Sequence, residues 1–309
     1  MQAKTNTGQL PNFLVIGAAK SGTSALYRYL KQHPEIFMSP VKEPHFFGYE
    51  NQPPNTQGPD DFVNTAITDL NEYRALFSQV TTEKAIGEAS PTYIHLPRAV
   101  ERIQHHVPNA KLIAILRHPA DRAFSAYMHV IRDQRETVAN FRDALRLEKE
   151  RIAKNWGPIW HYTQVGFYHK HLKRYYDSFA SEQIRVYLYE DFKAAPSTIL
   201  RDIFQFLEIN TEFTPDLQIQ VNVSGTQKSR IFYNLIHTLF DKPNPFKYTA
   251  QQLIPEPIRW RFTSYVRNKN LKKQVIDPEV RQDLIGLFRE DICKLQDLID
   301  RDLTDWLTP

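Results

Sequence analysis

The sequence predicts an α/β fold, with a P-loop-like central parallel sheet and helices on both faces. Short apolar segments alternate along the chain with longer segments of helical period, which is the pattern of a parallel sheet. The apolar segment Phe13–Ile16 runs into a glycine-containing turn and then a helix, as a ligand-binding strand–turn–helix unit does. With 309 residues, 41% of them hydrophobic, the chain can form one domain over residues 1–309 with its own core.

The elements of the sheet are predicted from short apolar runs, and the helices from apolar residues at helical spacing. Phe13–Ile16 is the first such run, and the helix after it begins at Thr23. Further strands are expected at Ala85–Glu88, Lys111–Leu116 and Ile184–Tyr189. Helices are expected at Thr23–Gln32, Asn71–Phe77, Arg98–His105, Pro119–Arg132, Phe141–Lys154, Gly166–Phe179 and Pro196–Leu207.

The C-terminal part is predicted as a helical extension, with a helix and tail over residues 277–307. Asp277 can cap this helix and Pro278 fits its first position, and an apolar stripe follows as far as Ile299. Residues 240–275 form a looser basic and aromatic region that begins with a Pro-rich turn or linker. Residues 48–61, rich in Pro, Asn, Gln and Gly, resemble a flexible loop.

Composition narrows the class of protein. No apolar run approaches the roughly 20 residues needed to cross a bilayer, and Met1–Pro11 lacks the apolar part of a secretion signal, so we expect a cytoplasmic protein. The single cysteine, Cys293, excludes an internal disulfide and a cysteine-based zinc site, and no metal-ligand spacing is found. A net charge of +4 is too weak and dispersed to indicate a nucleic-acid partner.

The glycine turn predicts a site for one phosphate. Gly17 and Gly22 have the spacing of the ATP-binding P-loop, but Thr23 stands where that loop has its lysine, and the lysine lies inside the loop as Lys20. Such a loop can hold one phosphate at a helix N-terminus and place an ammonium on the group attached to it, but it suits a metal-bound triphosphate poorly. Alternatively, the two glycines only let the helix pack closely on the strand.

A second motif predicts another anion site. Arg117 ends the strand Lys111–Leu116, and Ser125 follows eight positions later on the next helix, in which Pro119 fits the first turn. The planar guanidinium and the hydroxyl can converge on one anion. Alternatively, both are ordinary surface side chains.

Together these motifs resemble the sulfotransferases that use 3′-phosphoadenosine 5′-phosphosulfate (PAPS). The resemblance runs from about Phe13 to Leu307, and Lys42–Phe47 is most similar to the heparan-sulfate and related carbohydrate branch. We expect a soluble, bacterial-type member of the family. The family-like segments are Lys20–Leu26, Lys42–Phe47, Gly87–Tyr93, Arg117–Ser125, Gly166–Leu172 and Arg301–Leu307.

The resemblance implies a PAPS site, with 3′,5′-ADP as the product, and no metal. Lys20 would stabilise the leaving phosphate, and Arg117 and Ser125 would hold the 3′-phosphate. The residues expected to bind the 5′-phosphate are Ser21, Gly22, Thr23 and Ser24. The residues expected in a basic loop over the nucleotide are Lys228 and Arg230, as candidate 3′-phosphate contacts, and Phe232, as a candidate for stacking on adenine.

The resemblance also implies a general base, Glu43. We expect the neighbouring Phe46 and Phe47 to desolvate this carboxylate and raise its pKa. His45 is the alternative base, or a partner that orients Glu43 or the acceptor. Lys42 is a candidate second cation on the transferred group, or an exposed lysine.

The molecule that accepts the sulfuryl group is the part of the implied reaction that the sequence defines least. A hydroxyl or amine of a carbohydrate, lipid or other small molecule fits, but Ala89 stands where heparan-type relatives often have a lysine, which weakens the case for a heparan-like acceptor. The aromatic residues that could form a wall beside the acceptor are Tyr93, Trp156, Trp160 and Tyr162.

Other interpretations of the sequence stay open. The segment Arg259–Lys273 mixes bases with aromatics, so it is either a contact for a membrane surface, a partner or an anionic acceptor, or a solvated face. The sequence does not indicate an oligomeric state. The alternative functions are a small-molecule kinase and a nucleotide-binding protein without catalysis.

Overall fold

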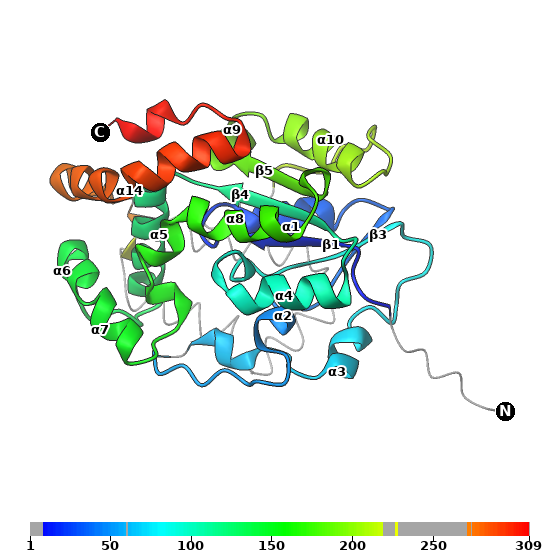
Figure 1. The fold of residues 1–309 in the computed structure, drawn as a ribbon, viewed down its shortest axis with the longest axis horizontal. Helices are drawn as coiled ribbons and strands as arrows, with labels where there is room; N and C mark the ends of the chain where they lie inside the picture. Colours follow the sequence, from blue (N-terminus) through cyan, green and yellow to red (C-terminus); the bar gives the residue numbers. More distant parts are fainter. Residues whose placement is uncertain (1–8, 60, 219–225, 228–270, 273, 309) are drawn as a thin grey trace.

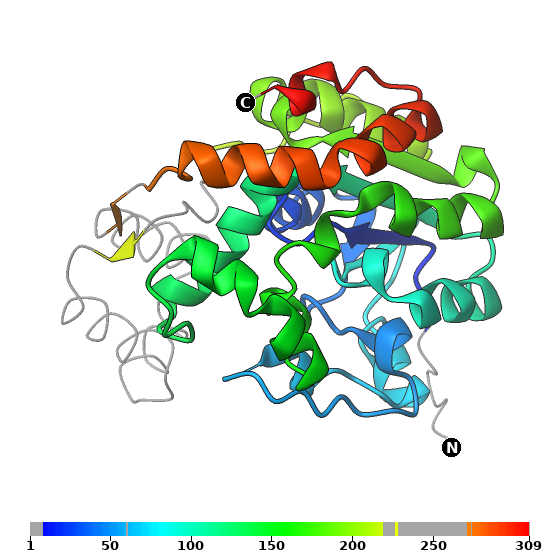
Figure 2. The same ribbon diagram turned by 60° about the vertical axis from the view of Figure 1, so that its left-hand side comes forward.

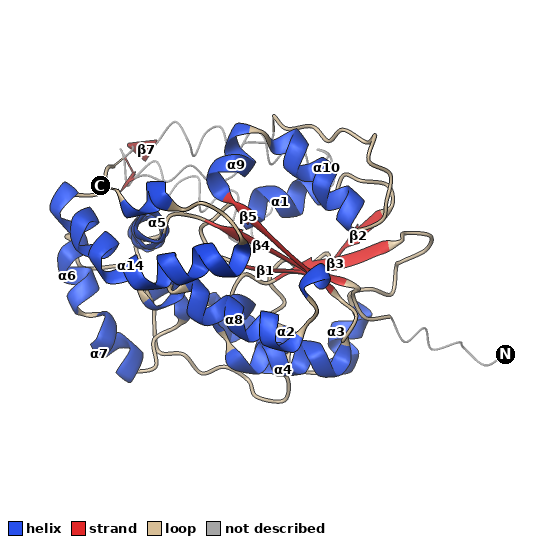
Figure 3. Cartoon of the chain, turned by 45° about the horizontal axis from the view of Figure 1, so that its top comes forward, coloured by secondary structure: helices blue, strands red, loops and turns tan. Residues whose placement is uncertain are grey.

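The computed structural model describes residues 9–59, 61–218, 226–227, 271–272 and 274–308. Its centre is a five-stranded parallel sheet in the order β2-β3-β1-β4-β5, with helices on both faces (Figures 1 and 3). The strands are β1 Phe13–Gly17, β2 Ile36–Met38, β3 Ala85–Ala89, β4 Lys111–Leu116 and β5 Ile184–Leu188. The predicted fold class is therefore confirmed.

The helices connect these strands and cover the sheet. They are α1 Thr23–Leu30, α2 Phe46–Tyr49, α3 Leu70–Ala75, α4 Pro97–His106, α5 Pro119–Arg132, α6 Phe141–Arg146, α7 Glu148–Ala153, α8 Tyr168–Ser178, α9 Tyr189–Ala194, α10 Pro196–Phe206 and α14 Pro278–Ile299. A short antiparallel pair joins β6 Thr226–Gln227 to β7 Leu271–Lys272. None of the helices within the described ranges is long and apolar enough to cross a membrane.

The sheet separates two hydrophobic cores, because successive side chains of a strand point to opposite faces. Phe13 and Val15 of β1 pack with residues of α1, α9 and α10, whereas Leu14 and Ile16 pack with residues of α2, α4, α5, α8 and α14. All four side chains are fully buried. The continuous apolar runs that predicted the central strands thus reflect burial on both faces.

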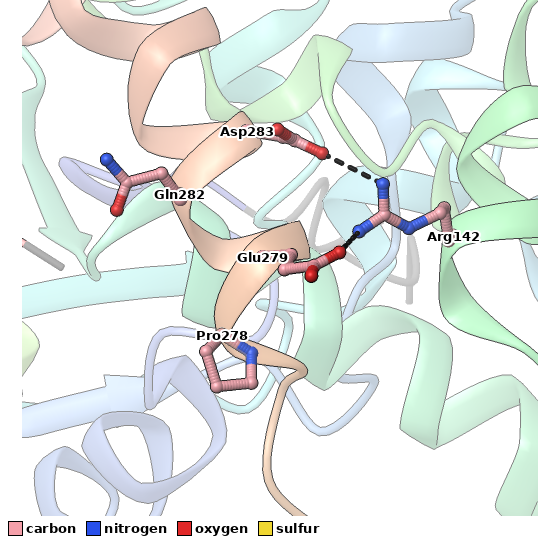
Figure 4. Close-up of a pocket in the computed structure, with 5 residues that line it drawn as sticks. All are labelled: Arg142, Pro278, Glu279, Gln282 and Asp283. Carbon is pink, nitrogen blue, oxygen red and sulfur yellow. Dashed lines mark hydrogen bonds and ion pairs between the residues drawn. The ribbon is translucent and has the colours of Figure 1, made fainter.

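The last helix is stabilised at its start and along its length. Asp277 caps α14 by accepting hydrogen bonds from the backbone N–H groups of Glu279 (3.0 Å) and Val280 (3.2 Å). Arg142 of α6 pairs with Glu279 and Asp283, each at 3.1 Å, beside an open hollow of the surface (Figure 4). Figure 2 shows α14 lying across α5 and α8. The predicted cap and helix are confirmed.

Two predicted elements differ from the structure, and one strand was not predicted. The single helix expected over 141–154 divides at Leu147 into α6 and α7, and at the start of α7 the buried Glu148 carboxylate accepts hydrogen bonds from the N–H groups of Thr163 (2.9 Å) and Gln164 (3.0 Å). Strand β2 lies at the edge of the sheet, and its three residues are too few to show the periodicity of a strand in the sequence. Gly48, expected to begin a flexible loop, lies in α2.

Candidate active site

The candidate site lies at the carboxyl ends of β1, β3 and β4, which are neighbouring strands of the sheet. Open α/β sheets bind ligands at this edge. The loop after β1 carries Lys20, and the segment after β4 carries Arg117. A third segment, residues 42–45, is joined to the end of β3 by a hydrogen bond from the Glu43 N–H to the Ala89 carbonyl (3.1 Å).

The two glycines of the first loop have different roles. Gly22 has φ 95° and precedes α1, so the first N–H groups of that helix, which have no intrahelical acceptors, face the loop. A side chain on Gly17 would come within 2.7 Å of Ile94, so this glycine is required for packing. Gly17 thus serves packing, but against Ile94 and not against the helix, and Gly22 allows the left-handed turn before α1, whose role as an anion site stays a prediction.

The other loop residues are enclosed to different degrees. Ser21 is fully buried, and its N–H donates to the Ala18 carbonyl at 3.2 Å. Thr23 is buried and Ser24 half-buried on the first turn of α1. Their roles at the 5′-phosphate stay predictions.

Lys20 is surrounded by charged groups from two other segments. Burial, and then the Arg132 guanidinium at the end of α5, lower the pKa of Lys20 to about 7, while Asp133 and Glu43 act in the opposite direction. Lys20 is therefore close to the C-terminus of α5 and to residues 42–45, which hold the candidate base and are called the base segment below. An anion beside this ammonium would stabilise its charged form.

Arg117 is close to the first loop. Its Nη1 lies 3.5 Å from the Lys20 carbonyl oxygen, and its guanidinium lies 5.0 Å from the centre of the Tyr189 ring. The hydroxyl of Tyr168 donates to the Arg117 carbonyl at 2.9 Å. Ser125 is buried on α5. The structure thus brings Arg117 to the first loop, as its position after a neighbouring strand required, and the role of Ser125 stays a prediction.

The carboxylate of Glu43 is within a group of cations. It forms an ion pair with Lys42, its Oε2 lies 3.7 Å from His45 Nε2, and its side chain is 22% exposed, so an acceptor can reach it. Burial raises the pKa of Glu43, but Lys42, His45 and Lys20 outweigh burial and hold the pKa below its ordinary value. The expected rise in the pKa is therefore wrong, because Phe46 and Phe47 are buried in the core and the cations dominate.

His45 is fully buried next to Glu43. Its backbone N–H donates to Ser90 Oγ at 3.1 Å, and its Nδ1 lies 2.9 Å from Thr92 Oγ1. Burial lowers the pKa of His45, although the neighbouring Glu43 carboxylate acts in the opposite direction. These contacts fit the role of a partner for Glu43 better than that of the main base.

Sequence reasoning missed several residues around Glu43. Glu88 of β3 is fully buried, and burial raises its pKa to about 7. Its position inside a strand gave no sign that it lies behind Glu43. At the end of α5, Arg132 Nε donates to Asp133 Oδ1 at 2.8 Å, near Lys20. Only the fold brings this helix end to the loop.

Of the four aromatic residues that could form a wall beside the acceptor, three are core residues instead. Tyr93, Trp160 and Tyr162 are fully buried in the core, where they cannot contact an acceptor, and Trp156 is half-buried. Phe62, which sequence reasoning missed, is 37% exposed, and its ring centre lies 5.9 Å from that of His45. Lys228, Arg230 and Phe232, and the segment 259–270, lie outside the described residues.

Residues 10–292 match the sulfotransferase domain family. The chain belongs to the sulfotransferase family. The match covers both loops, the base segment and most of α14. The resemblance inferred from the motifs is therefore confirmed.

Known relatives of this sulfotransferase include carbohydrate-modifying enzymes. A bifunctional heparan sulfate N-deacetylase/N-sulfotransferase 4 of Mus musculus is 30% identical over 93% of this chain and 32% of its own length. A heparan sulfate glucosamine 3-O-sulfotransferase 3B1 of Mus musculus is 28% identical over 67% of this chain and 48% of its own length. The chain thus spans about a third to a half of these two relatives.

A solved structure supports the fold of this sulfotransferase over nearly its whole length. The crystal structure of a sulfotransferase from Alicyclobacillus acidocaldarius has a TM-score of 0.77 and 36% sequence identity. The comparison covers 97% of this chain and 100% of the other.

Proposed function

We propose that this sulfotransferase moves a sulfuryl group from PAPS to a hydroxyl or amine of a carbohydrate-type acceptor. The observation that carries the proposal is the proximity of Lys20 and Glu43, each of which shifts the pKa of the other. One is a cation in a phosphate-type loop, and the other is a partly exposed carboxylate. A donor phosphate and an acceptor hydroxyl therefore have matching groups on adjacent segments.

The residues present fit a nucleotide with separate 5′ and 3′ phosphates. The left-handed Gly22 and the N-terminus of α1 suit one phosphate. The guanidinium of Arg117, next to the Lys20 carbonyl, suits a second. PAPS supplies a sulfuryl group on a phosphate leaving group, and its 3′-phosphate distinguishes it from ATP.

The chain's own residues then account for the transfer. Glu43 accepts the proton of the acceptor hydroxyl as the acceptor oxygen forms its bond to sulfur. The bond between sulfur and the phosphate oxygen breaks, and Lys20 stabilises the charge that develops on that oxygen. Lys42, which pairs with Glu43, would neutralise charge on the transferred group. Positioning and electrostatics supply most of the rate in related group transfers.

The first experiment compares ligands by thermal shift. At about 100 times its Kd, a ligand should add about 2.7 kcal/mol of stability. We expect stabilisation by 3′,5′-ADP in the presence of EDTA, and none by ATP–Mg²⁺. The reverse result would indicate the small-molecule kinase, against which the position of Lys20 already argues.

The second experiment measures turnover of labelled PAPS with a panel of acceptors. The panel holds heparan-type glycans, uncharged glycans, lipid alcohols and aromatic alcohols. Transfer to glycans supports the proposal, and transfer to lipid or aromatic alcohols alone contradicts the acceptor class. Binding of 3′,5′-ADP without any turnover would indicate a nucleotide-binding protein without catalysis.

A further inference from the structure

A buried carboxylate that the proposed reaction does not use lies behind the base segment. Glu88, near the end of β3, is fully buried, and within the described ranges no basic side chain forms an ion pair with it. Its Oε2 accepts a hydrogen bond from Ser90 Oγ at 2.8 Å, and its Oε1 accepts one from the Tyr73 hydroxyl at 3.3 Å. A buried carboxylate is costly for folding, so its position calls for a physical reason.

Ser90 connects this carboxylate to the base segment. The same Ser90 Oγ that donates to Glu88 accepts the hydrogen bond from the His45 backbone N–H, at 3.1 Å. Two further contacts join the segment to the end of β3: the Glu43 N–H donates to the Ala89 carbonyl at 3.1 Å, and His45 Nδ1 lies 2.9 Å from Thr92 Oγ1. Of these three attachments, the one through Ser90 leads to an ionisable side chain.

The base segment needs such attachments because its backbone is in an uncommon conformation. Glu43 has φ 63° and His45 has φ 57°, both in the left-handed region that non-glycine residues rarely adopt. Residues held there keep this conformation only when the surrounding structure fixes them. If the attachment at His45 loosens, the backbone can relax and the Glu43 carboxylate changes direction.

We propose that Glu88 is a positioning residue for the general base and acts through Ser90. A serine hydroxyl rotates freely and can both donate and accept hydrogen bonds. By accepting the Ser90 proton, Glu88 fixes that rotation and leaves a Ser90 lone pair directed at the His45 N–H. The His45 turn is then held, and Glu43 is aimed at the acceptor. This inference rests on the proposed function.

The test removes the link at two points. Glu88→Leu has a similar volume and no acceptor for Ser90, and Ser90→Ala removes the connecting hydroxyl. We expect each to lower kcat about 10- to 100-fold, because small misplacements of a reacting group have effects of this size. The acceptor KM and the Kd for 3′,5′-ADP should stay within about threefold, because the link touches neither ligand. The double variant should lose no more than the worse single variant, since both changes break one link.

Tyr73→Phe is the matched control. It removes another hydrogen bond to the Glu88 carboxylate but leaves the Ser90 link in place. Its kcat should stay close to that of the wild type. An equal loss of kcat in Tyr73→Phe would overturn the proposal, because it would show that general packing around Glu88 matters and the link does not.

The remaining outcomes separate this inference from the proposed function. Glu88→Leu that binds 3′,5′-ADP and keeps wild-type kcat overturns the positioning role alone. If Glu88→Leu does not fold, wild-type kcat in Ser90→Ala overturns it, because that variant also breaks the link. If the wild-type enzyme shows no turnover with any acceptor, both the proposed function and the positioning role of Glu88 are overturned.

Discussion

The guanidinium of Arg117 lies 3.5 Å from the backbone carbonyl of Lys20, although 97 positions separate the two residues. The contact arises because β1 and β4 are parallel neighbours and the segments after them begin at the same edge of the sheet. It places the Arg117 guanidinium beside the loop that is proposed to hold the 5′-phosphate. A nucleotide with a 5′- and a 3′-phosphate would therefore contact two segments that follow neighbouring strands of the sheet, β1 and β4.

Arg117→Ala and Ser125→Ala should weaken the binding of 3′,5′-ADP and barely change the binding of 5′-AMP. A hydrogen bond to a charged group contributes about 1.5–3 kcal/mol, and the Arg117 guanidinium can make two of them, so Arg117→Ala should have the larger effect. Isothermal titration calorimetry with both nucleotides measures the difference. Equal losses for the two nucleotides would show that these residues do not bind the 3′-phosphate.

Binding of 3′,5′-ADP should be accompanied by proton uptake at Lys20. The pKa of Lys20 is about 7, so at pH 8 the side chain is mostly neutral, and an adjacent phosphate favours its charged form. Uptake should be close to one proton at pH 8 and small at pH 6. Calorimetry in buffers of different ionisation enthalpy measures it.

Lys20→Met is the control for this experiment. It should abolish the uptake and lower turnover by about 10²–10³, the usual effect of removing one preorganised charge donor. Undiminished uptake in Lys20→Met would assign the proton to another group.

Glu43→Gln should keep the fold and the affinity for 3′,5′-ADP but lower turnover by about 10²–10⁴, the usual effect of losing a general base. The pKa of Glu43 is held below its ordinary value by Lys42, His45 and Lys20, although burial opposes them. Because the charged form is the base, kcat/KM for the acceptor, measured at saturating PAPS so that the donor keeps Lys20 charged, should show no acidic limb until the pH falls below the ordinary glutamate pKa. The pH profile of the wild type checks this.

His45→Asn should cost less than Glu43→Gln. Asparagine tolerates the left-handed backbone at this position, so the substitution tests the ring and not the turn. If His45→Asn abolishes turnover while Glu43→Gln stays active, the two roles are reversed. The mechanism would then be closer to that of the histidine-dependent phenol and steroid sulfotransferases.

Acidification should destabilise the protein through His171. Burial lowers the pKa of His171 to about 4, and its Nε2 is 2.8 Å from the Gln164 carbonyl oxygen. The unfolded chain binds the proton first, so this contribution is complete above the ordinary pKa of 6.5 and is lost as the pH falls toward 4. At pH 5 the loss in the free energy of unfolding should be about 2 kcal/mol.

Urea unfolding at pH 7.5 and pH 5 tests this contribution. His171→Gln should lose less stability between the two pH values than the wild type does. His105→Gln, on the exposed surface of α4, serves as the control and should behave as the wild type. An equal pH dependence in all three proteins would assign the acid sensitivity to other groups.

The sequence predicted the parts of the fold that depend on local pattern. Strand Lys111–Leu116 and helix Pro119–Arg132 have the predicted bounds, because one is a continuous buried run and the other has a proline at its first position. The cap at Asp277 could be predicted for the same reason, because its hydrogen bond reaches only two residues along the chain, to the Glu279 N–H. The phosphate-type loop and Arg117 could be placed together because both follow central strands.

Properties that depend on distant segments could not be predicted in this way. The pKa of Glu43 falls because cations gather around it, and Lys20 comes from another segment. Trp160 is aromatic like Phe62, but one is in the core and the other is partly exposed, which only the packing of the chain decides. Glu88 appeared as a polar residue within a strand, and its link to His45 required two segments to meet.

The position of β1 between β3 and β4 has a consequence for how such enzymes diversify. The phosphate loop, the attachment of the base and Arg117 all stand on one stiff sheet, whereas Phe62 and Trp156 lie on segments outside it. If the proposed function holds, substitutions or insertions in those outer segments would change the molecule that is modified and leave the donor chemistry undisturbed. Natural or engineered variants with altered outer segments would then accept a different molecule and still use the same donor and the same transfer reaction.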